Sequence, residues 1–347
     1  MKERNQTVDA LRAFAALWVC LFHFTVATGI GAHGHLGVTI FFVISGFIVP
    51  HSMMRSGYTI AAWPTFMLKR LVRLEPPYLV SIALILGLGA LDMHSGTPPQ
   101  WTATQLVGHL GYANAFLGLP WLNAVYWSLA IELQFYVLMG VALPLLMLAR
   151  TPERRLAGIT LASCVPLLLP GRNNATIVAF LPVFAAGTLT FLRATKMIGQ
   201  ASYWAALAVL ALIVFVKHDA GVALATTGTA VLIATVRIPR IRPVAWLGAI
   251  SYSLYLLHGP VGYRVGDAIR RLSGSELMPV VAIIGPLAAS ITAAVVLHRF
   301  VERPALQLAA RIGYRIAVTN VGSAATVEGP PAPEPARTRR EGRSPAS

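Results

Sequence analysis

The sequence predicts an all-α, polytopic membrane protein with about ten transmembrane helices, because the chain holds that many apolar runs and a span needs ~20 mostly apolar residues. Hydrophobic residues make up 56% of the 347 residues and charged residues only 12%, about half of the charged fraction of an ordinary soluble domain. The mean hydropathy is +0.66. These values exclude a soluble globular protein.

The apolar runs lie between charged or Pro/Gly-rich breaks, and each run predicts a helix. Several are shorter than a full span, so flanking residues or local thinning of the bilayer would help them to cross. In chain order, the predicted spans are residues 11–28, 37–53, 77–91, 126–148, 157–169, 175–192, 203–216, 221–236, 244–262 and 279–298. Residues 101–122 are also apolar, but Gly and Pro interrupt them, which predicts a re-entrant or interfacial segment instead of a further crossing.

The distribution of basic residues predicts the topology. With the N-terminus in the cytoplasm, 23 of the 28 Lys and Arg residues fall on the cytoplasmic side of these spans and 5 on the other side, as the positive-inside rule requires. A crossing at 101–122 would invert every later loop. We therefore expect both termini in the cytoplasm and a multi-pass protein of the inner (plasma) membrane.

Two parts of the chain are predicted. Residues 1–316 form the transmembrane domain, and residues 317–347, rich in Pro, Ala, Arg and Glu, are too polar to bury a core and are expected to be a disordered cytoplasmic tail. The basic and then apolar N-terminus also resembles a signal peptide. Polar residues along its apolar run (Asp9, Arg12 and His23) favour a retained helix.

The sequence offers little support for a nucleic-acid-binding surface, a disulfide framework or a metal site. The formal charge is +15, but the basic residues lie between apolar runs instead of in one stripe, so no nucleic-acid partner is expected. Cys20 and Cys164 lie in apolar segments and offer neither a disulfide framework nor a thiolate metal site. His33, His35 and His51 have no carboxylate or thiolate close by in the sequence, so no metal is expected there.

Three ionisable side chains are predicted at one depth in the membrane, where such groups are costly and mark functional sites. At 1.5 Å per residue, His23 and His258 lie ~21 Å above the cytoplasmic ends of their spans, and Glu132 lies ~9 Å below the outer surface of a core ~30 Å thick. We therefore expect a buried polar site in the outer half of the membrane. A carboxylate beside an imidazole builds a general base, so Glu132 is predicted to orient His23. The alternative for each residue is a structural hydrogen bond between helices.

A basic cluster lies in the segment FMLKRLVRLEPPY, residues 66–78, whose Pro76–Pro77 pair is predicted to open the next span. It places Arg70 and Arg73 on one helical turn with Lys69 beside them. Because Arg side chains bind phosphates bidentately, we expect a polyphosphate ligand on the cytoplasmic side. The alternative is an ordinary basic anchor at the membrane surface. In the second span, the small residues Ser45 and Gly46 predict close helix packing.

Six segments match, in order, the motifs of a known family. They are VDALRAFAALWVCLFH, in which ten residues separate Arg12 from His23, GVTIFFVISGFIV (37–49), FMLKRLVRLEPPY (66–78), YWSLAIELQFY (126–136), SYSLYLLHGPV (251–261) and VERP (301–304). On these motifs the chain resembles the acyltransferase 3 family of integral membrane acyltransferases. The family moves acyl groups, often acetyl, from acyl-CoA to hydroxyls of glycans, lipopolysaccharide, Nod factors or macrolides.

The resemblance implies roles for single residues. Arg12 and His23 correspond to a pair regarded as essential in the family, and Arg70 and Arg73 to paired arginines associated with acyl-CoA. Glu132 matches the acidic position of a Ser-Leu-x-x-Glu motif, and Tyr136 its aromatic end. The expected site residues are His23 and Glu132 for catalysis, Arg12, Arg70, Arg73 and Lys69 for acyl-CoA binding, and Asp9, Ser45, Tyr136 and His258 in support.

Two positions depart from the family pattern. Ala10 stands where Gly is usual, and Glu75 stands where an aliphatic residue is common. A carboxylate beside Arg73 is expected to weaken the local positive field. No segment after residue 310 resembles the secreted hydrolase-like domain of longer members, so the chain is expected to complete the transfer alone or to pass the acyl group to another protein.

The resemblance implies an O-acyltransferase without a permanently bound cofactor, whose partners are acyl-CoA, a saccharide or other hydroxyl acceptor, and the lipid bilayer. His23 would act as a general base on the acceptor hydroxyl, with a covalent acyl-histidine as the alternative. A transporter that performs no chemistry is the alternative function, but the sequence has neither paired broken spans nor an inverted repeat. The acceptor, the acyl length and the oligomeric state, a homo-oligomer included, stay open.

Overall fold

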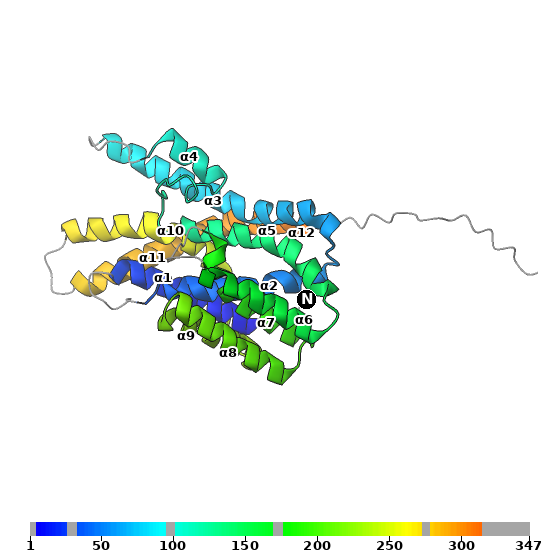
Figure 1. Cartoon of the computed structure of the whole chain (residues 1–347). Helices are drawn as coiled ribbons and strands as arrows, with labels where there is room; N and C mark the ends of the chain where they lie inside the picture. Colours follow the sequence, from blue (N-terminus) through cyan, green and yellow to red (C-terminus); the bar gives the residue numbers. More distant parts are fainter. Residues whose placement is uncertain (1–4, 26–32, 95–100, 169–175, 273–277, 314–347) are drawn as a thin grey trace, which may run out of the picture. The chain divides into compact units, whose positions relative to one another are not determined.

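The computed structural model describes residues 5–25, 33–94, 101–168, 176–272 and 278–313. These residues are built from helices and their connections, with no strand among them (Figure 1). The chain divides into two units, Met1–Tyr314 and Arg315–Ser347. The predicted tail, 317–347, lies outside the described residues, so its disorder stays a prediction.

Each of the ten predicted spans contains a helix. These helices are α1 (Gln6–Thr25), α2 (Leu36–Arg55), α3 (Trp63–His94), α5 (Tyr126–Leu148), α6 (Pro152–Cys164), α7 (Leu181–Ala194), α8 (Gln200–Lys217), α9 (Ala220–Thr235), α10 (Arg242–Leu272) and α11 (Met278–Leu297). The described residues also form α4 (Ala103–Leu110), α12 (Arg303–Arg311), the 3₁₀ turns η2 (Ile60–Ala62), η3 (Val165–Leu168) and η4 (Ile177–Phe180), and a π-helix, η5 (His298–Glu302).

Seven helical segments of the described ranges are long and apolar enough to cross a membrane. They are Gln6–Thr25, Leu36–Arg55, Ile60–Leu91, Tyr126–Leu148, Ile177–Ala194, Gln200–Lys217 and Val281–Arg311. Helices α6 and α9 are shorter, with 13 and 16 residues. Helix α10 has 31 residues but is less apolar, since it carries charged residues toward both ends and the buried Ser251, Ser253 and His258 between them. A multi-pass helical membrane protein is therefore confirmed, and the count of ten spans stays a prediction.

Helix α3 differs from its prediction. One helix of 32 residues runs from Trp63 to His94 and passes through Pro76 and Pro77, so no helix begins at the proline pair. Membrane helices tolerate proline because neighbouring side chains satisfy freed backbone groups. Next to the pair, the hydroxyl of Tyr252 on α10 donates to the carbonyl of Leu74 (2.9 Å).

Residues 101–122 contain only a short helix. Helix α4 has eight residues and begins with a capping box between Thr102 and Gln105. Its length of ~12 Å is too short for a crossing. The segment folds on itself, because the backbone N–H of Leu122 donates to His109 Nε2 (3.1 Å). It is therefore not a full transmembrane helix, and its re-entrant or interfacial position stays a prediction.

Helices α2 and α7 pack with their backbones in contact. A Cβ atom on Gly46 would overlap the carbonyl oxygen of Phe184, and one on Gly187 would overlap that of Val43. The prediction that Gly46 marks close helix packing is confirmed. Its neighbour Ser45 instead points to α5 and belongs to the site described below.

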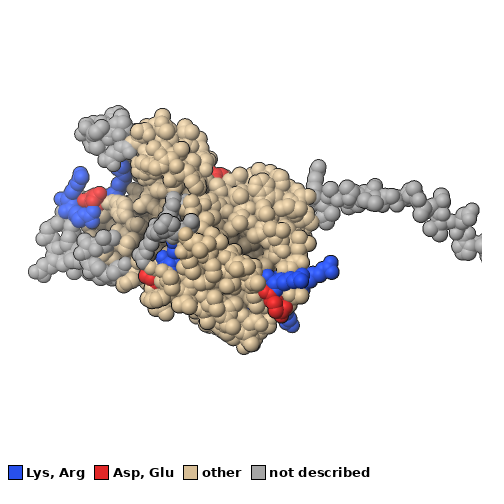
Figure 2. Space-filling model, in the orientation of Figure 1, with Lys and Arg blue, Asp and Glu red and all other residues tan. Residues whose placement is uncertain are grey.

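Charged side chains on the face shown in Figure 2 gather toward the two ends of the described bundle, and most of the surface between them is uncharged. Large apolar side chains are exposed on the long helices, among them Leu145 on α5 and Leu212 on α8. In water such a surface would be unfavourable, whereas lipid tails solvate it.

Candidate active site

Predicted site residues from α1, α2, α3 and α5 meet around one polar cavity of ≈ 60 Å³. We call Arg12, Ser45, Arg70, Arg73, Glu132 and Tyr136 the arginine–glutamate cluster. All except Arg70 line this cavity, together with Ser128 and with Ser251, Tyr252 and Tyr255 of α10. Arg70 lines a smaller cavity of ≈ 10 Å³, which shares Glu132, Tyr136 and Tyr252 with the first.

Glu132 lies at the centre of this cluster. Ser45 Oγ donates a hydrogen bond to its Oε1 from α2 (2.9 Å). The hydroxyl of Tyr136, one turn further along α5, donates to the same oxygen. Two donors therefore hold the carboxylate, as expected for an ionisable group inside a helix bundle.

Arg12 connects α1 to α10. Its Nε donates to Ser251 Oγ (3.2 Å), and the Ser251 hydroxyl donates to the carbonyl of Gly248 (3.0 Å). Asp9 lies one turn before Arg12 and is only 4% exposed. A Cβ on Gly248 would overlap the Asp9 backbone carbonyl. This close approach of the two helices brings the Arg12 side chain within reach of Ser251.

Arg70 and Arg73 point from α3 into the protein. Arg70 is only 8% exposed, and its guanidinium carbon lies 5.1 Å from the ring centre of Tyr136 and 5.2 Å from that of Phe66. These distances are in the range of cation–π contacts. A basic anchor at the membrane surface would be exposed, so the burial of Arg70 argues against that alternative.

The Lys69 side chain reaches the C-terminal end of α12. Its Nζ donates to the carbonyl of Ile312, directly after α12 (3.2 Å), where a cation satisfies a free helix-end carbonyl. Glu75, by contrast, lines the smaller cavity with Arg70 and Tyr112. The sequence departure at Glu75 therefore puts a second carboxylate close to the arginines.

A second polar group, which we call the histidine cluster, consists of His23 on α1 and His258 and Tyr263 on α10. The rings of His23 and His258 lie 5.0 Å apart, which confirms that they share one level. Tyr263 Oη and His23 Nδ1 are hydrogen-bonded at 2.7 Å. No pattern in the sequence indicated Tyr263, which lies one residue beyond the predicted span 244–262.

His258 is fully buried and has a defined protonation pattern. Its Nδ1 lies 2.8 Å from the carbonyl of Tyr255, and because a carbonyl only accepts, Nδ1 must carry the proton. Nε2 is then the acceptor in a neutral ring, and it has no hydrogen-bond partner among the described residues. A free acceptor therefore lies beside His23.

The predicted pairing of His23 with Glu132 is wrong in this structure. Ser128, one turn from Glu132 on α5, is hydrogen-bonded to the hydroxyl of Tyr255 (2.7 Å), which lies one turn before His258. Glu132 is thus displaced from the histidine level by about two turns, ~10 Å. The height calculation assumed that all spans begin at the membrane surface, but α10 continues 14 residues beyond His258 to Leu272.

Glu302 is a buried carboxylate that the sequence analysis did not select, although it lies in the VERP segment. It is 4% exposed. Its Oε2 accepts from Ser253 Oγ on α10 (2.6 Å) and lies 2.9 Å from His298 Nδ1 within η5. π-Helical turns are rare and are frequent at functional sites. The available signal in the sequence was an acidic residue directly after an apolar run and inside a family motif.

Comparison with known proteins gives consistent results. The family model described as an acyltransferase domain matches residues 5–299, which include both clusters. A relative from Komagataeibacter xylinus, named as the membrane-bound transacylase BcsY, is 31% identical over 75% of this chain and 73% of its own length. No solved structure gives a significant match.

Two longer relatives are named as O-acetyltransferases. The Bacillus subtilis protein YrhL, named as a peptidoglycan O-acetyltransferase, is 27% identical over 73% of this chain and 48% of its own length. OatA of Staphylococcus aureus is 25% identical over 86% of this chain and 56% of its own length. The chain thus spans about half the length of these two relatives. Because the family model covers most of the sequence and includes both polar clusters, the chain belongs to the acyltransferase 3 family of membrane O-acyltransferases.

Proposed function

We propose that this acyltransferase moves an acyl group, such as acetyl, from acyl-CoA to a hydroxyl of a saccharide. The observation that supports this best is that the paired helices α1 and α10 connect the two polar clusters. Arg12 bonds Ser251 in one, and His23 lies beside His258 in the other, 11 residues or ~16 Å further along α1. Acyl-CoA has matching features, with phosphates at one end of a long flexible arm and the thioester at the other.

The arginine–glutamate cluster would receive the donor. Arg12, Arg70 and Arg73 attract phosphates to this end of the bundle. The cavity of ≈ 60 Å³ has room for only a few water molecules. The nucleotide would therefore stay at the mouth, and only the arm with its thioester would enter. Glu132 would balance the arginine charges instead of orienting His23.

The histidine cluster would perform the transfer. The acceptor oxygen attacks the thioester carbonyl carbon while His23 Nε2 takes the hydroxyl proton. The C–S bond then breaks, and the CoA thiolate leaves and receives that proton from the imidazolium. Tyr263 acts as a positioning residue, because a hydrogen bond from His23 Nδ1–H to its oxygen leaves Nε2 free as the base. His258 Nε2 would accept a hydrogen bond from a second hydroxyl of the saccharide acceptor.

The number of spans and their orientation in the membrane are part of the proposal. Ten spans with both termini in the cytoplasm of a plasma-membrane protein would place the arginine–glutamate cluster toward the cytoplasm, where acyl-CoA is made. The histidine cluster would then lie toward the outer face. The excess of cytoplasmic basic residues, 23 against 5, supports this orientation.

Transfer can be tested with purified protein in proteoliposomes, labelled acetyl-CoA and oligosaccharides released from bacterial cell walls. Release of the CoA thiol and formation of a labelled ester are measured together. His23→Ala should lower transfer at least ~100-fold, the size of a general-base contribution. His218→Ala is the control, because this ring contacts the Ala179 carbonyl outside both clusters (2.8 Å) and should retain transfer.

Two results would contradict the proposal. Full transfer by a folded His23→Ala protein would remove the role of this residue, and saccharide movement without CoA release would favour a transporter.

Acetyl-CoA binding is checked separately by calorimetry. The double variant Arg70→Ala/Arg73→Ala should bind the donor more weakly, whereas Arg299→Ala, an exposed arginine outside both clusters, should not.

A further inference from the structure

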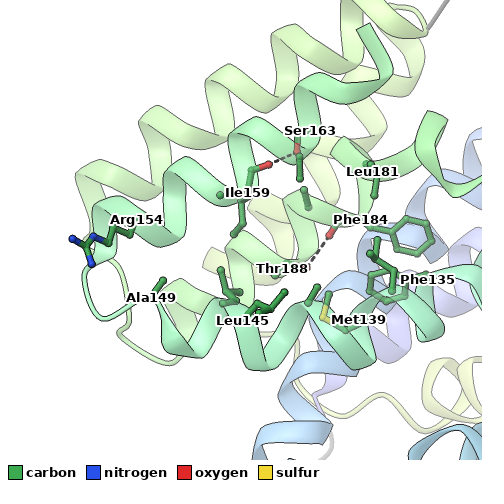
Figure 3. Close-up of a pocket in the computed structure, with 16 residues that line it drawn as sticks. Phe135, Met139, Leu145, Ala149, Arg154, Ile159, Ser163, Leu181, Phe184 and Thr188 are labelled. Atoms are coloured by element: carbon green, nitrogen blue, oxygen red, sulfur yellow. Dashed lines mark hydrogen bonds between the residues drawn. The ribbon is translucent and has the colours of Figure 1, made fainter. Parts of the chain in front are cut away.

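An apolar groove of ≈ 280 Å³ lies between α5, α6 and α7. Figure 3 shows Arg154 at one end of the groove and Phe135 and Phe184 at the other, with Ala149, Leu145 and Met139 along α5 between them. Helices α5 and α7 belong to segments apolar enough to cross a membrane. The groove is therefore placed where lipid tails are the surrounding solvent.

The polar groups that line the groove are satisfied within the protein. Ser163 Oγ donates to the carbonyl of Ile159 in its own helix (2.8 Å), and Thr188 Oγ1 contacts the carbonyl of Phe184 (3.2 Å). The other lining residues are apolar, with Arg154 as the charged exception. The groove thus offers hydrocarbon along its length and one positive charge at its end.

The dimensions suit a single long acyl chain. From Ala149 to Phe135 the groove follows α5 for 14 residues, ~21 Å. The space arises from small side chains, namely Ala142, Gly158, Ala162 and Ala185. At Gly158, an added Cβ would meet no atom within 4 Å.

The charged end suits a phosphate. Arg154 is exposed in the first turn of α6, and Arg150 is exposed just before this helix. Exposed arginines near a membrane surface attract anionic lipid headgroups, and the N-terminal end of a helix adds partial positive charge. We propose that the groove binds an acyl chain of one anionic glycerophospholipid, with its phosphate at Arg154.

Native mass spectrometry of the detergent-purified, delipidated full chain tests this binding. The probes are phosphatidylglycerol, which is anionic, and phosphatidylcholine with the same acyl chains. The wild type should retain one phosphatidylglycerol more tightly than phosphatidylcholine. Arg154→Gln should weaken phosphatidylglycerol binding about fivefold, the usual contribution of one basic residue near a membrane. Arg299→Gln, another exposed arginine, should leave it unchanged.

A second variant fills the groove itself. Gly158→Phe should abolish the bound lipid, because its ring would occupy open space. Gly87→Phe on α3, where a Cβ also meets no atom within 4 Å, is the matched control and should bind lipid like the wild type. Unchanged lipid binding in a folded Gly158→Phe protein would overturn the proposal. If the wild type were a dimer, Gly158→Phe a monomer, and neither protein bound lipid, the groove would be assigned to a second copy of the chain.

Discussion

Tyr263 holds the candidate base of the proposed reaction, since its hydroxyl is hydrogen-bonded to His23 Nδ1 (2.7 Å). Tyr263→Phe removes this bond and keeps the ring. We expect kcat to fall about fivefold, because a hydrogen bond contributes about 1 kcal/mol, while KM for acetyl-CoA stays unchanged. Steady-state kinetics and a pH profile of kcat measure this effect.

Tyr58→Phe is the matched control for that prediction. The Tyr58 hydroxyl donates to the carbonyl of Gly140 (2.7 Å), outside both clusters, so its loss should lower stability by about 1 kcal/mol and leave kcat unchanged. Equal losses of kcat in both variants would make Tyr263 merely structural.

Glu302 gives a prediction about stability. Ser253→Ala removes the donor that faces this buried carboxylate, and we expect a loss of about 2 kcal/mol, as for a buried charged acceptor deprived of one partner. Thermal unfolding in detergent, followed by circular dichroism, measures the change. Ser163→Ala is the control, because its hydroxyl bonds only a carbonyl of its own helix. A smaller change for Ser253→Ala than for Ser163→Ala would contradict the assigned interaction.

The residues of the arginine–glutamate cluster were predicted individually, whereas their grouping came from the structure. The sequence analysis placed Glu132 beside His23 because a sequence gives the position of a residue along its own span. It does not give how far one helix is shifted along its axis relative to its neighbour. The side chains of Ser128 and Tyr255, which set this offset, are typical of membrane helix contacts. Their pairing between two distant segments leaves no local sequence pattern. Tyr263 was missed for the same reason.

At the scale of single helices, the contact between α2 and α7 gives a sharp prediction. Gly46→Ala should destabilise the protein by about 3 kcal/mol, because the added methyl group overlaps the backbone of α7 and the packed helices must separate. Gly87→Ala on α3 adds the same group in open space and should be neutral or stabilising by up to about 1 kcal/mol. Thermal unfolding of both variants measures the difference, and equal melting temperatures would contradict the close packing.

The existence of the helices was predictable, and their ends were less so. Apolar runs predicted α1, α2 and α5 because lipid requires continuous backbone hydrogen bonding. The start of α3 was predicted too late, since proline breaks soluble helices more reliably than membrane helices. In α10 the buried polar residues Ser251 and Ser253 lower the hydropathy, although the helix packs between neighbours that hide them.

For the whole molecule, the membrane class follows from composition, but the number of crossings depends on α6, α9 and α10. Helix α6 together with η3 covers Pro152–Leu168, 17 residues or ~25 Å, a little less than a bilayer core of ~30 Å. The charge distribution nevertheless favours a crossing by each of these helices. If one of them did not cross, every later loop would change sides and the excess of cytoplasmic basic residues would become smaller.

Cysteine labelling tests this topology around α6 and α9. Cys164 is replaced by Ser, and Cys20 is retained because it is buried. Single cysteines are introduced at exposed positions on both sides of the two helices, as Glu153→Cys, Leu168→Cys, Ala220→Cys and Arg240→Cys. A membrane-impermeant maleimide is then applied to spheroplasts before and after permeabilisation. Because positive loops stay in the cytoplasm, Leu168→Cys and Ala220→Cys should react at once, and the other two only after permeabilisation. If both members of a flanking pair reacted on the same side of the membrane, the helix between them would not cross. Every loop after that helix would then lie on the side opposite to the one proposed.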